Sequence, residues 1–379
     1  MSILMQPTSI GKLSLKNRIV MAPMGVTIGN MTESTVAYFV ERARGGAAMI
    51  VCNVMGSGRF ESTEHSIFFN EETERLFAKV VEQSHAYDCK VCAQIMTGVG
   101  RAGGPSLLYP VPVSASPCGW KYAPNVPCHE LTIDEIHALE DDYRHSVESA
   151  VRAGADAIEI HAYGGYLTDQ FLTAAWNTRQ DEYGGTLEKR ARFLKDLIDI
   201  CKDVGGKDYP VLVKYTPDHY VEEDDGHRKM EEGIALTKLM EQYGVDGLHV
   251  DAGCYENWYY AMPPAAIQEM TLQARSAKII KQVSHLPVLT HGRFSDVVKA
   301  EAALRNQVCD IVVIGRGLLA DPELPKKVAE KRPEDIRPCI SCNEGCIGQV
   351  CLGKPATCAV NPRCGHEDGS YDIRDYGTP

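Results

Sequence analysis

Long apolar segments are absent from this chain of 379 residues: no run of about 18 apolar residues occurs, so no membrane-spanning segment is predicted. The first residues lack a basic stretch followed by an apolar one, so no export signal is expected either. Positive charge is also scarce, since 39 Lys and Arg stand against 51 Asp and Glu. The net charge of −12 argues against nucleic acid as a partner, because phosphate binding needs a basic surface.

Cysteine, by contrast, is abundant, with 14 residues. Several cysteines stand alone in apolar segments, where an oxidising compartment would invite mispairing. A reducing cytoplasm leaves such residues as small core side chains, so we expect a cytoplasmic protein. The isolated cysteines are Cys52, Cys201 and Cys309.

Four other cysteines form the most informative pattern of the chain. The C-x2-C-x3-C spacing lets one tight loop place three thiolates around one side of a cubane, and a distant cysteine supplies the fourth corner, as iron–sulfur ligation requires. Zinc is the weaker interpretation, because structural zinc usually shows two C-x2-C-like pairs at longer separation, and unligated thiols are weaker still. An iron–sulfur cluster, and hence electron transfer, is predicted. The four cysteines are Cys339, Cys342, Cys346 and Cys358.

Short apolar or β-branched runs recur along the chain, with helix-like segments between them. The helical segments have start signals, such as the capping box from Thr132 to Glu135. Strands that alternate with helices imply parallel βα units, and eight of them imply a TIM barrel rather than an open doubly wound sheet. We expect the barrel in residues 1–331 and a loop-rich cluster module in residues 332–379. The predicted strands are 18–21, 47–51, 90–94, 155–160, 211–214, 247–250, 287–290 and 311–314.

A TIM barrel has its chemistry at the C-terminal ends of its strands. A Gly-Arg pair follows each of the last two predicted strands, where barrels commonly bind phosphate: glycine lets backbone N–H groups approach, and arginine adds a bidentate charge. Gln94 can hydrogen-bond an amide-like ring edge, and Lys214 can hold a cation against a ring that becomes anionic on reduction. Each residue alone is more often simply a polar residue of a barrel mouth, but the ordered set fits FMN. The pairs are Gly292-Arg293 and Gly315-Arg316.

Six motifs spread over nearly the whole chain are RIVMAPM at 18–24, QIM at 94–96, EIHAYGGYL at 159–167, NTRQDEYGG at 177–185, GRGLLADP at 315–322 and RPCISC at 337–342. In combination they resemble the old yellow enzyme family. More narrowly, the chain is similar to the iron–sulfur branch with 2,4-dienoyl-CoA reductase, 2-enoate reductase and the bile-acid steroid reductases. The resemblance implies an FMN barrel, a [4Fe–4S] cluster and reduction of carbon–carbon double bonds next to a carbonyl.

The resemblance also implies roles for single residues. Tyr166 occupies the proton-donor position, and His161 the position that hydrogen-bonds the substrate carbonyl. Tyr255 stands where dienoyl-CoA reductases have a histidine, and Lys214 stands where the family usually has arginine, so the charge is kept but the planar fork is lost. The residues expected at FMN are Pro23, Met24, Gly25, Val54, Gln94, Lys214, Gly292, Arg293, Gly315 and Arg316.

The chain departs from the family in two further places. Gly164 replaces the Asn or His that usually follows His161 by three residues, and the segment 94–101 is one residue longer and lacks a histidine. A wider or less polar pocket is therefore expected. Loop aromatics could line it for a flat apolar substrate or could simply fill the barrel mouth. They are Trp120, Tyr122, Trp258, Tyr259 and Tyr260.

We predict an ene-reductase in which the cluster passes electrons to FMN, flavin N5 delivers hydride to an enoate, enoyl-CoA or steroid enone, and Tyr166 protonates the α-carbon. His161 and Tyr255 would polarise the carbonyl. No G-x-G-x-x-G follows a strand near the C-terminus, so electrons are expected from a separate protein or from FAD- and NAD(P)H-binding domains of a longer chain. The alternatives are an amine dehydrogenase like trimethylamine dehydrogenase and a non-catalytic electron carrier. A homo-oligomer is left open.

Overall fold

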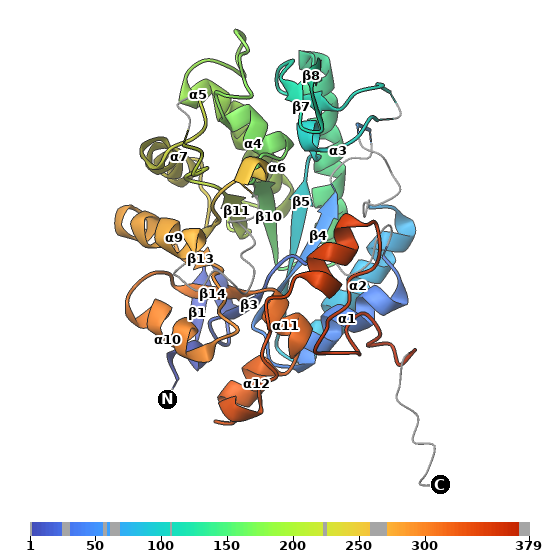
Figure 1. Cartoon of the computed structure of the whole chain (residues 1–379), viewed down its shortest axis with the longest axis vertical. Coiled ribbons are helices and arrows are strands. Elements are labelled where there is room, and N and C mark those ends of the chain that lie inside the picture. The colour runs from blue at the N-terminus through green and yellow to red at the C-terminus, as the bar shows by residue number, and fades with distance from the viewer. Residues whose placement is uncertain are drawn as a thin grey trace.

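Eight parallel strands close into a barrel at the centre of the computed structural model, which describes residues 2–24, 31–55, 59–60, 69–106, 108–222, 226–257 and 271–370 (Figure 1). Neighbouring strands pair in chain order, and the last strand pairs with the first to complete the TIM barrel. The strands are β3 (Ile19–Met21), β4 (Met49–Met55), β5 (Lys90–Met96), β10 (Ala157–Ala162), β11 (Val211–Tyr215), β12 (Gly247–Val250), β13 (Val288–Thr290) and β14 (Ile311–Ile314).

All eight predicted strands are present, and the predicted barrel is confirmed. The main difference is that β4 and β5 extend further than expected, to Met55 and Met96. The first prediction stopped before Asn53, but Asn53 remains in the ladder and pairs in register with Gln94, the last residue of the strand predicted over 90–94. Their polar side chains lie near the mouth, where the barrel needs no apolar filling.

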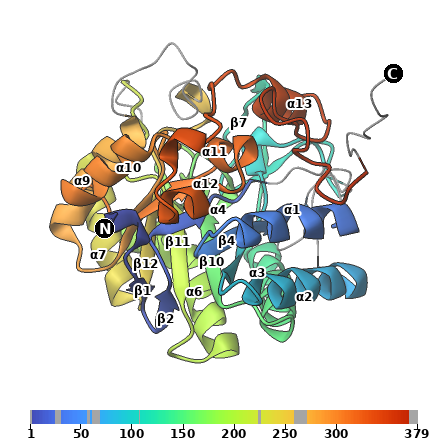
Figure 2. The ribbon, with the colours of Figure 1, turned by 90° about the horizontal axis from the view of Figure 1, so that it is seen from below.

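Helices surround the barrel, as Figures 1 and 2 show. The predicted capping box at Thr132 is confirmed: its side chain accepts from the Glu135 backbone, and the Glu135 side chain accepts from the Thr132 backbone. The helices are α1 (Glu33–Arg44), α2 (Glu71–His85), α3 (Ile133–Arg152), α4 (Leu167–Leu172), α5 (Leu187–Arg190), α6 (Arg192–Gly205), α7 (Met230–Gln242), α9 (Leu272–Val283), α10 (Val297–Arg305), α11 (Arg316–Ala320), α12 (Leu324–Ala329) and α13 (Gln349–Cys351).

Two apolar cores hold these layers together. One lies between strands and helices, and the other fills the barrel interior. The N-terminal hairpin of β1 (Thr8–Ile10) and β2 (Leu13–Leu15) adds Ile10 and Leu15 to the interior core. This arrangement fills the interior with side chains and leaves the C-terminal ends of the strands for function.

Residues beyond 331 return to the barrel. Asn361 donates to the Leu319 carbonyl at the end of α11 at 2.8 Å, Arg42 of α1 pairs with Glu367, and Cys364 is fully buried. In Figure 2 this segment, with α13, lies beside α11. The cysteine loop is therefore attached to the barrel next to the eighth strand.

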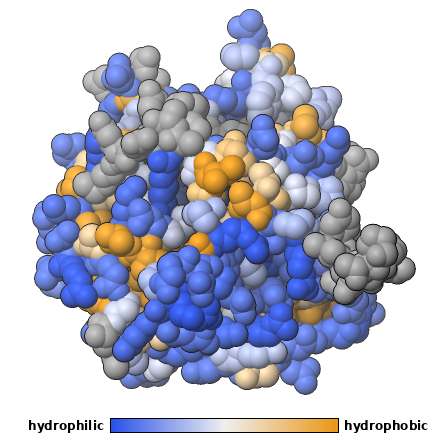
Figure 3. Space-filling view, turned by 60° about the horizontal axis from the view of Figure 1, so that its bottom comes forward, coloured by the Kyte–Doolittle hydropathy of each residue, from blue (hydrophilic) through white to orange (hydrophobic). Residues whose placement is uncertain are grey.

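No described helix is long and apolar enough to cross a bilayer. The face turned forward in Figure 3 is mostly hydrophilic, with small groups of apolar side chains among the polar ones.

Candidate functional site

A cavity of about 470 Å³ lies at the C-terminal ends of the barrel strands and continues to the cysteine loop. It brings together residues that the sequence places far apart. Predicted site residues along its wall are Pro23, Met24, Tyr166, Lys214, Tyr255, Gly292, Arg293, Gly315 and Arg316, with Cys339 and Cys346 at the far end.

Lys214 lies in this cavity and has two partners. Its ammonium nitrogen is 3.1 Å from an Asp251 carboxylate oxygen and 4.0 Å from the centroid of the Tyr163 ring. Burial alone would raise the pKa of Asp251, but His291, at 3.4 Å, and Lys214 lower it well below the usual range. The carboxylate is therefore charged, and it holds the Lys214 cation in one place.

A buried network lies beside Lys214. Gln94 donates to one oxygen of Glu159 at 2.6 Å, and His249 Nδ1 lies 2.8 Å from the other. Burial alone would raise the pKa of Glu159, but His249, Lys214 and Gln94 together lower it. Because the Gln94 amide nitrogen donates to anionic Glu159, the orientation of the amide is fixed. The amide oxygen of Gln94 is then left to accept from another group.

Two glycines shape the loop that presents Tyr166. Gly164 and Gly165 have φ values of 71° and 88°, in the region that favours glycine. The Gly165 N–H donates to buried Asp169 at 2.8 Å, and the Tyr255 N–H donates to the Gly164 carbonyl at 3.1 Å. These bonds join the loops after β10 and β12, and they place the Tyr166 and Tyr255 rings 5.1 Å apart.

His161 packs against the rings of Tyr163 and Tyr166, which with Tyr255 form a group of tyrosines at this site. Its ring centroid is 4.5 Å from that of Tyr163 and 4.4 Å from that of Tyr166. Burial, reinforced by Lys214, lowers the pKa of His161 to about 3, so the imidazole is neutral near pH 7. Within the described ranges, buried His161 Nδ1 and Asn53 Oδ1 have no hydrogen-bond partner. Both atoms are therefore available to a bound group.

Tyr166 keeps its proton at neutral pH. Burial raises the pKa of the phenol above its usual range, and nearby Tyr163 adds to this effect, while a hydrogen bond with Tyr255 opposes it. A protonated phenol in a cavity wall can donate a proton to a bound molecule.

Two arginines give the part of the cavity next to β13 and β14 a positive charge. Arg293 and Arg316 follow β13 and β14, and burial together with Arg316 lowers the pKa of Arg293, as expected for two neighbouring cations. A Cβ on Gly315 would lie 2.6 Å from the Met24 sulfur, so a larger residue there would push Met24 aside. Two neighbouring guanidiniums suit the phosphate of FMN, and the polar atoms at Lys214 suit its ring.

The four predicted cluster ligands line one hollow beside Arg316. The loop turns sharply because Ser341 and Asn343 have φ values of 55° and 61°. The Ser341 N–H then points at Cys339 Sγ at 3.4 Å, and Arg316 hydrogen-bonds the Asn343 side chain. The cysteines around the hollow are Cys339, Cys342, Cys346 and Cys358.

A family model described as the NADH:flavin oxidoreductase / NADH oxidase family matches residues 3–335. The chain belongs to this family. Cinnamate reductase of Clostridium sporogenes is 35% identical over 406 residues, which cover 99% of this chain and 59% of that protein. Among solved structures, a 2-naphthoyl-CoA reductase complex superposes with a TM-score of 0.87 at 28% identity, over 96% of this chain and 58% of that one.

A second similar structure is named a dehydrogenase rather than a reductase. Histamine dehydrogenase from Rhizobium sp. 4-9 has a TM-score of 0.86 at 25% identity, over 96% of this chain and 53% of that one. The chain spans between 54% and 59% of the length of the first curated relatives it matches. Membership of the NADH:flavin oxidoreductase family thus fixes an FMN barrel, but not the substrate.

Some expected residues lie elsewhere or outside the described ranges. Gln94 and His161 are buried and are not among the residues that line the cavity, and Val54 is buried in β4. Gly25 and the aromatics at 258–260 lie outside the described residues. Trp120 donates its indole N–H to the Gly103 carbonyl at 2.9 Å, and Tyr122 is exposed.

The sequence analysis missed several residues of the site. Glu159 could have been found because it stands two residues before His161 on one strand, so both point to the same face. The sequence does place Asp251 at the C-terminal end of a predicted strand, the usual place for a functional residue in a barrel, but assigns it no role. His291 directly follows β13 and Tyr163 directly follows β10, so the same signal applies to both. His249 stands two residues before Asp251 and so points to the same face of β12.

Proposed function

We propose that this chain is an FMN- and iron–sulfur-dependent ene-reductase that reduces the double bond of an α,β-unsaturated carbonyl compound. The observation that supports this best is the continuous cavity from the strand ends to Cys339 and Cys346. Two cofactors that exchange electrons must lie close together, and this cavity would keep them so. When bound, FMN supplies hydride to the substrate and the cluster supplies single electrons.

The two arginines and the residues around Lys214 support a role of the cavity in holding FMN. Arg293 and Arg316 would bind the phosphate, while Gly292 and Gly315 let the backbone approach it. Pro23, Met24, Gly25 and Val54 would lie against the flavin, as the resemblance implies. Lys214, held by Asp251, would stand beside the edge of the ring that gains negative charge, and Gln94 would offer its carbonyl oxygen to a ring N–H.

The hollow at the cysteine loop supports a [4Fe–4S] site with four thiolate ligands. We propose Cys339, Cys342, Cys346 and Cys358 as these ligands, in a module of residues 332–379 attached to the barrel of residues 1–331. An electron donor would serve it, either a separate protein or an FAD- and NAD(P)H-binding domain.

The tyrosine group would handle the substrate. Neutral His161 and Tyr255 can hydrogen-bond a carbonyl oxygen where negative charge develops. Tyr166 keeps its proton until a strong base forms, which suits it to protonate the α-carbon of the substrate. The ring faces around it favour a flat apolar substrate.

The names of the relatives support a substrate class rather than one compound. One relative is named a cinnamate reductase and one similar structure a 2-naphthoyl-CoA reductase. Both names refer to a conjugated acyl group next to an aromatic ring. An aryl enoate or its thioester is therefore our first candidate, ahead of a steroid enone.

The second candidate is oxidation of an amine, which the likeness to histamine dehydrogenase favours. Aromatic rings at the mouth could hold an ammonium group through cation–π contacts. Lys214 already places its ammonium 4.0 Å from the Tyr163 ring centroid, however, and a second cation beside it would be repelled. This contact favours the neutral or anionic carbonyl substrate.

The test uses anaerobically purified protein with both cofactors, reduced by dithionite and mixed in a stopped-flow instrument with cinnamate, 2-naphthoyl-CoA, an enoyl-CoA and a 3-keto-4-ene steroid. We expect at least one to reoxidise the flavin with stoichiometric formation of the product in which one carbon–carbon double bond is reduced. Oxidised protein is mixed with trimethylamine and with histamine in parallel. Bleaching by an amine, with no reoxidation by any alkene, would replace the first candidate with the second.

A further inference from the structure

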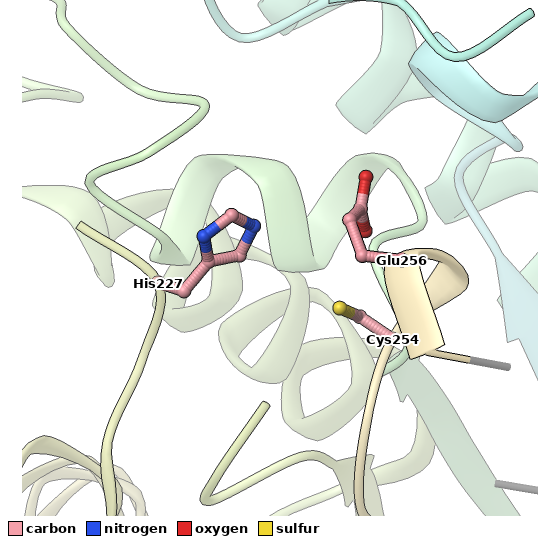
Figure 4. A group of neighbouring side chains, drawn as sticks. All are labelled: His227, Cys254 and Glu256. Atoms are coloured by element: carbon pink, nitrogen blue, oxygen red, sulfur yellow. The ribbon is translucent and has the colours of Figure 1, made fainter. Parts of the chain in front are cut away.

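Three side chains at the edge of the cavity at the strand ends converge on one point. The ligand atoms of His227, Cys254 and Glu256 all lie within 4.8 Å of one another. Figure 4 shows the imidazole and the thiol turned toward each other, with the carboxylate beside them. His227 lies between β11 and α7, whereas Cys254 and Glu256 lie in the turn after β12.

Both loops are fastened to His219, so the convergence is built into the fold. The His219 N–H donates to the Arg228 carbonyl at 2.9 Å, and the Arg228 N–H donates to His219 Nδ1 at 3.1 Å. From the other loop, the Asn257 side chain donates to the His219 carbonyl at 2.7 Å and accepts from the Cys254 N–H at 2.8 Å. His219 itself is fully buried and bonded to Asp169 at 3.0 Å.

The donor set has mixed chemistry. One sulfur, one imidazole nitrogen and one carboxylate oxygen are the ligands that Zn²⁺ takes, and three protein ligands leave one tetrahedral position for water. The Trp176 ring packs edge-on against His227 with centroids 5.1 Å apart, which limits rotation of the imidazole.

Two cationic side chains contact the Glu256 carboxylate, both at the same oxygen. Arg101 lies 2.7 Å and Lys121 3.6 Å from the same oxygen, Oε1 of Glu256. The Cys254 thiol is within hydrogen-bonding reach of the carboxylate. An ion that replaces the thiol proton would bind the sulfur and the second oxygen together, while Oε1 keeps its cations as outer partners.

We propose that His227, Cys254 and Glu256 form a zinc site, separate from the cysteine hollow, which fixes the turn after β12. Tyr255 stands between two of the ligands, and Cys254 lines the flavin cavity. The ion would therefore act as a positioning group for Tyr255. The site does not depend on which substrate the cavity takes.

The test measures zinc directly in protein that holds both FMN and iron. The protein is dialysed against Zn²⁺ with a competing chelator, and zinc and iron per chain are measured by mass spectrometry. We expect one zinc per chain at undiminished iron content. Cys254→Ser and His227→Gln should each weaken zinc binding by more than about 100-fold, beyond the loss typical of outer partners. The matched control Cys309→Ser, at a buried cysteine between α10 and β14, should bind zinc normally.

X-ray absorption at the zinc edge gives a second readout that needs no variant. One sulfur with nitrogen and oxygen neighbours supports the site, whereas four sulfurs would show that zinc occupies the cysteine hollow. Equal zinc binding by wild type and Cys254→Ser, or no zinc in the iron-loaded protein, would overturn the proposal. If the variants lose FMN or iron, the sulfur count in the wild type decides alone.

Discussion

Lys214 and Asp251 form an ion pair of 3.1 Å in which each side chain is almost wholly buried. Such a pair is costly to break from one side, because the remaining charge stays buried without its partner.

We expect Lys214→Met to lower the free energy of unfolding by about 3–5 kcal/mol, the range for removing one member of a buried pair. The double variant Lys214→Met with Asp251→Asn should recover much of this loss, since it leaves no lone charge. Calorimetric melting of the FMN-free protein measures both. Equal melting temperatures for the single and double variants would show that the pair is not coupled.

The two arginines at the cavity end should govern FMN affinity. Removing a charged hydrogen-bond donor typically costs about 1.5–3 kcal/mol, so Arg293→Gln should raise the Kd for FMN by roughly 10- to 150-fold. Fluorescence titration of the FMN-free protein gives the Kd, with riboflavin as a ligand that lacks the phosphate. Arg305→Gln, at an exposed arginine on α10, is the matched control and should bind FMN as the wild type does. A variant that loses riboflavin affinity as well would point to a damaged barrel.

Substitutions can separate the proposed cluster ligands from the neighbouring cysteines. Cys358 lines the hollow, while Cys351 is exposed and Cys364 is buried against the barrel, both outside the hollow. Cys358→Ser should therefore lose iron and the visible absorbance of the cluster, and Cys351→Ser and Cys364→Ser should keep them. Anaerobic iron analysis distinguishes these outcomes. If Cys351→Ser loses iron and Cys358→Ser keeps it, the fourth ligand is assigned wrongly.

Tyr166→Phe removes one hydroxyl and leaves the ring contacts in place. Reduction of FMN by dithionite should be unchanged, but reoxidation by an activated alkene should slow by about 10²-fold or more, the scale of a lost general acid. Single-turnover stopped flow separates the two half-reactions. Tyr163→Phe is the paired variant, since it alters a neighbouring phenol that contacts Lys214. Unaltered reoxidation in Tyr166→Phe would assign the proton to Tyr255 or Tyr163.

His161 should contribute to acid sensitivity. Its pKa is lowered to about 3 by burial and Lys214, whereas an unfolded histidine titrates near about 6.5. Between these values the unfolded chain binds the extra proton and the folded one does not, so stability falls as the pH drops from about 6.5 toward 3. His161→Gln should show a shallower loss of melting temperature over this range. The exposed His137→Gln should follow the wild type; a slope equal to the wild type in His161→Gln would contradict the assignment.

The barrel could be predicted from the sequence because each strand is a short apolar run that is buried on both faces, a local property. The cysteine hollow could be predicted for a similar reason, since three of its members lie in one loop. The ion pair of Lys214 with Asp251 and the network around Glu159 could not. They join residues on different strands, and their contacts exist only once the barrel closes.

The same limit applies to His227, Cys254 and Glu256. A single histidine in one loop and a cysteine in another have no metal-binding spacing in the sequence. Their convergence depends on His219, which hydrogen-bonds Arg228 in its own loop and Asn257 in the other.

Arg316 lines both the cavity at the strand ends and the hollow of the four cysteines. It is the first residue of α11, it lines the cavity expected to hold the FMN phosphate, and it bonds Asn343 inside the cysteine loop. Any disorder of that loop would release one side of the guanidinium that faces the phosphate. Maturation of the protein should accordingly be cooperative: chains that have received iron should retain flavin through purification, and iron-starved chains should shed it.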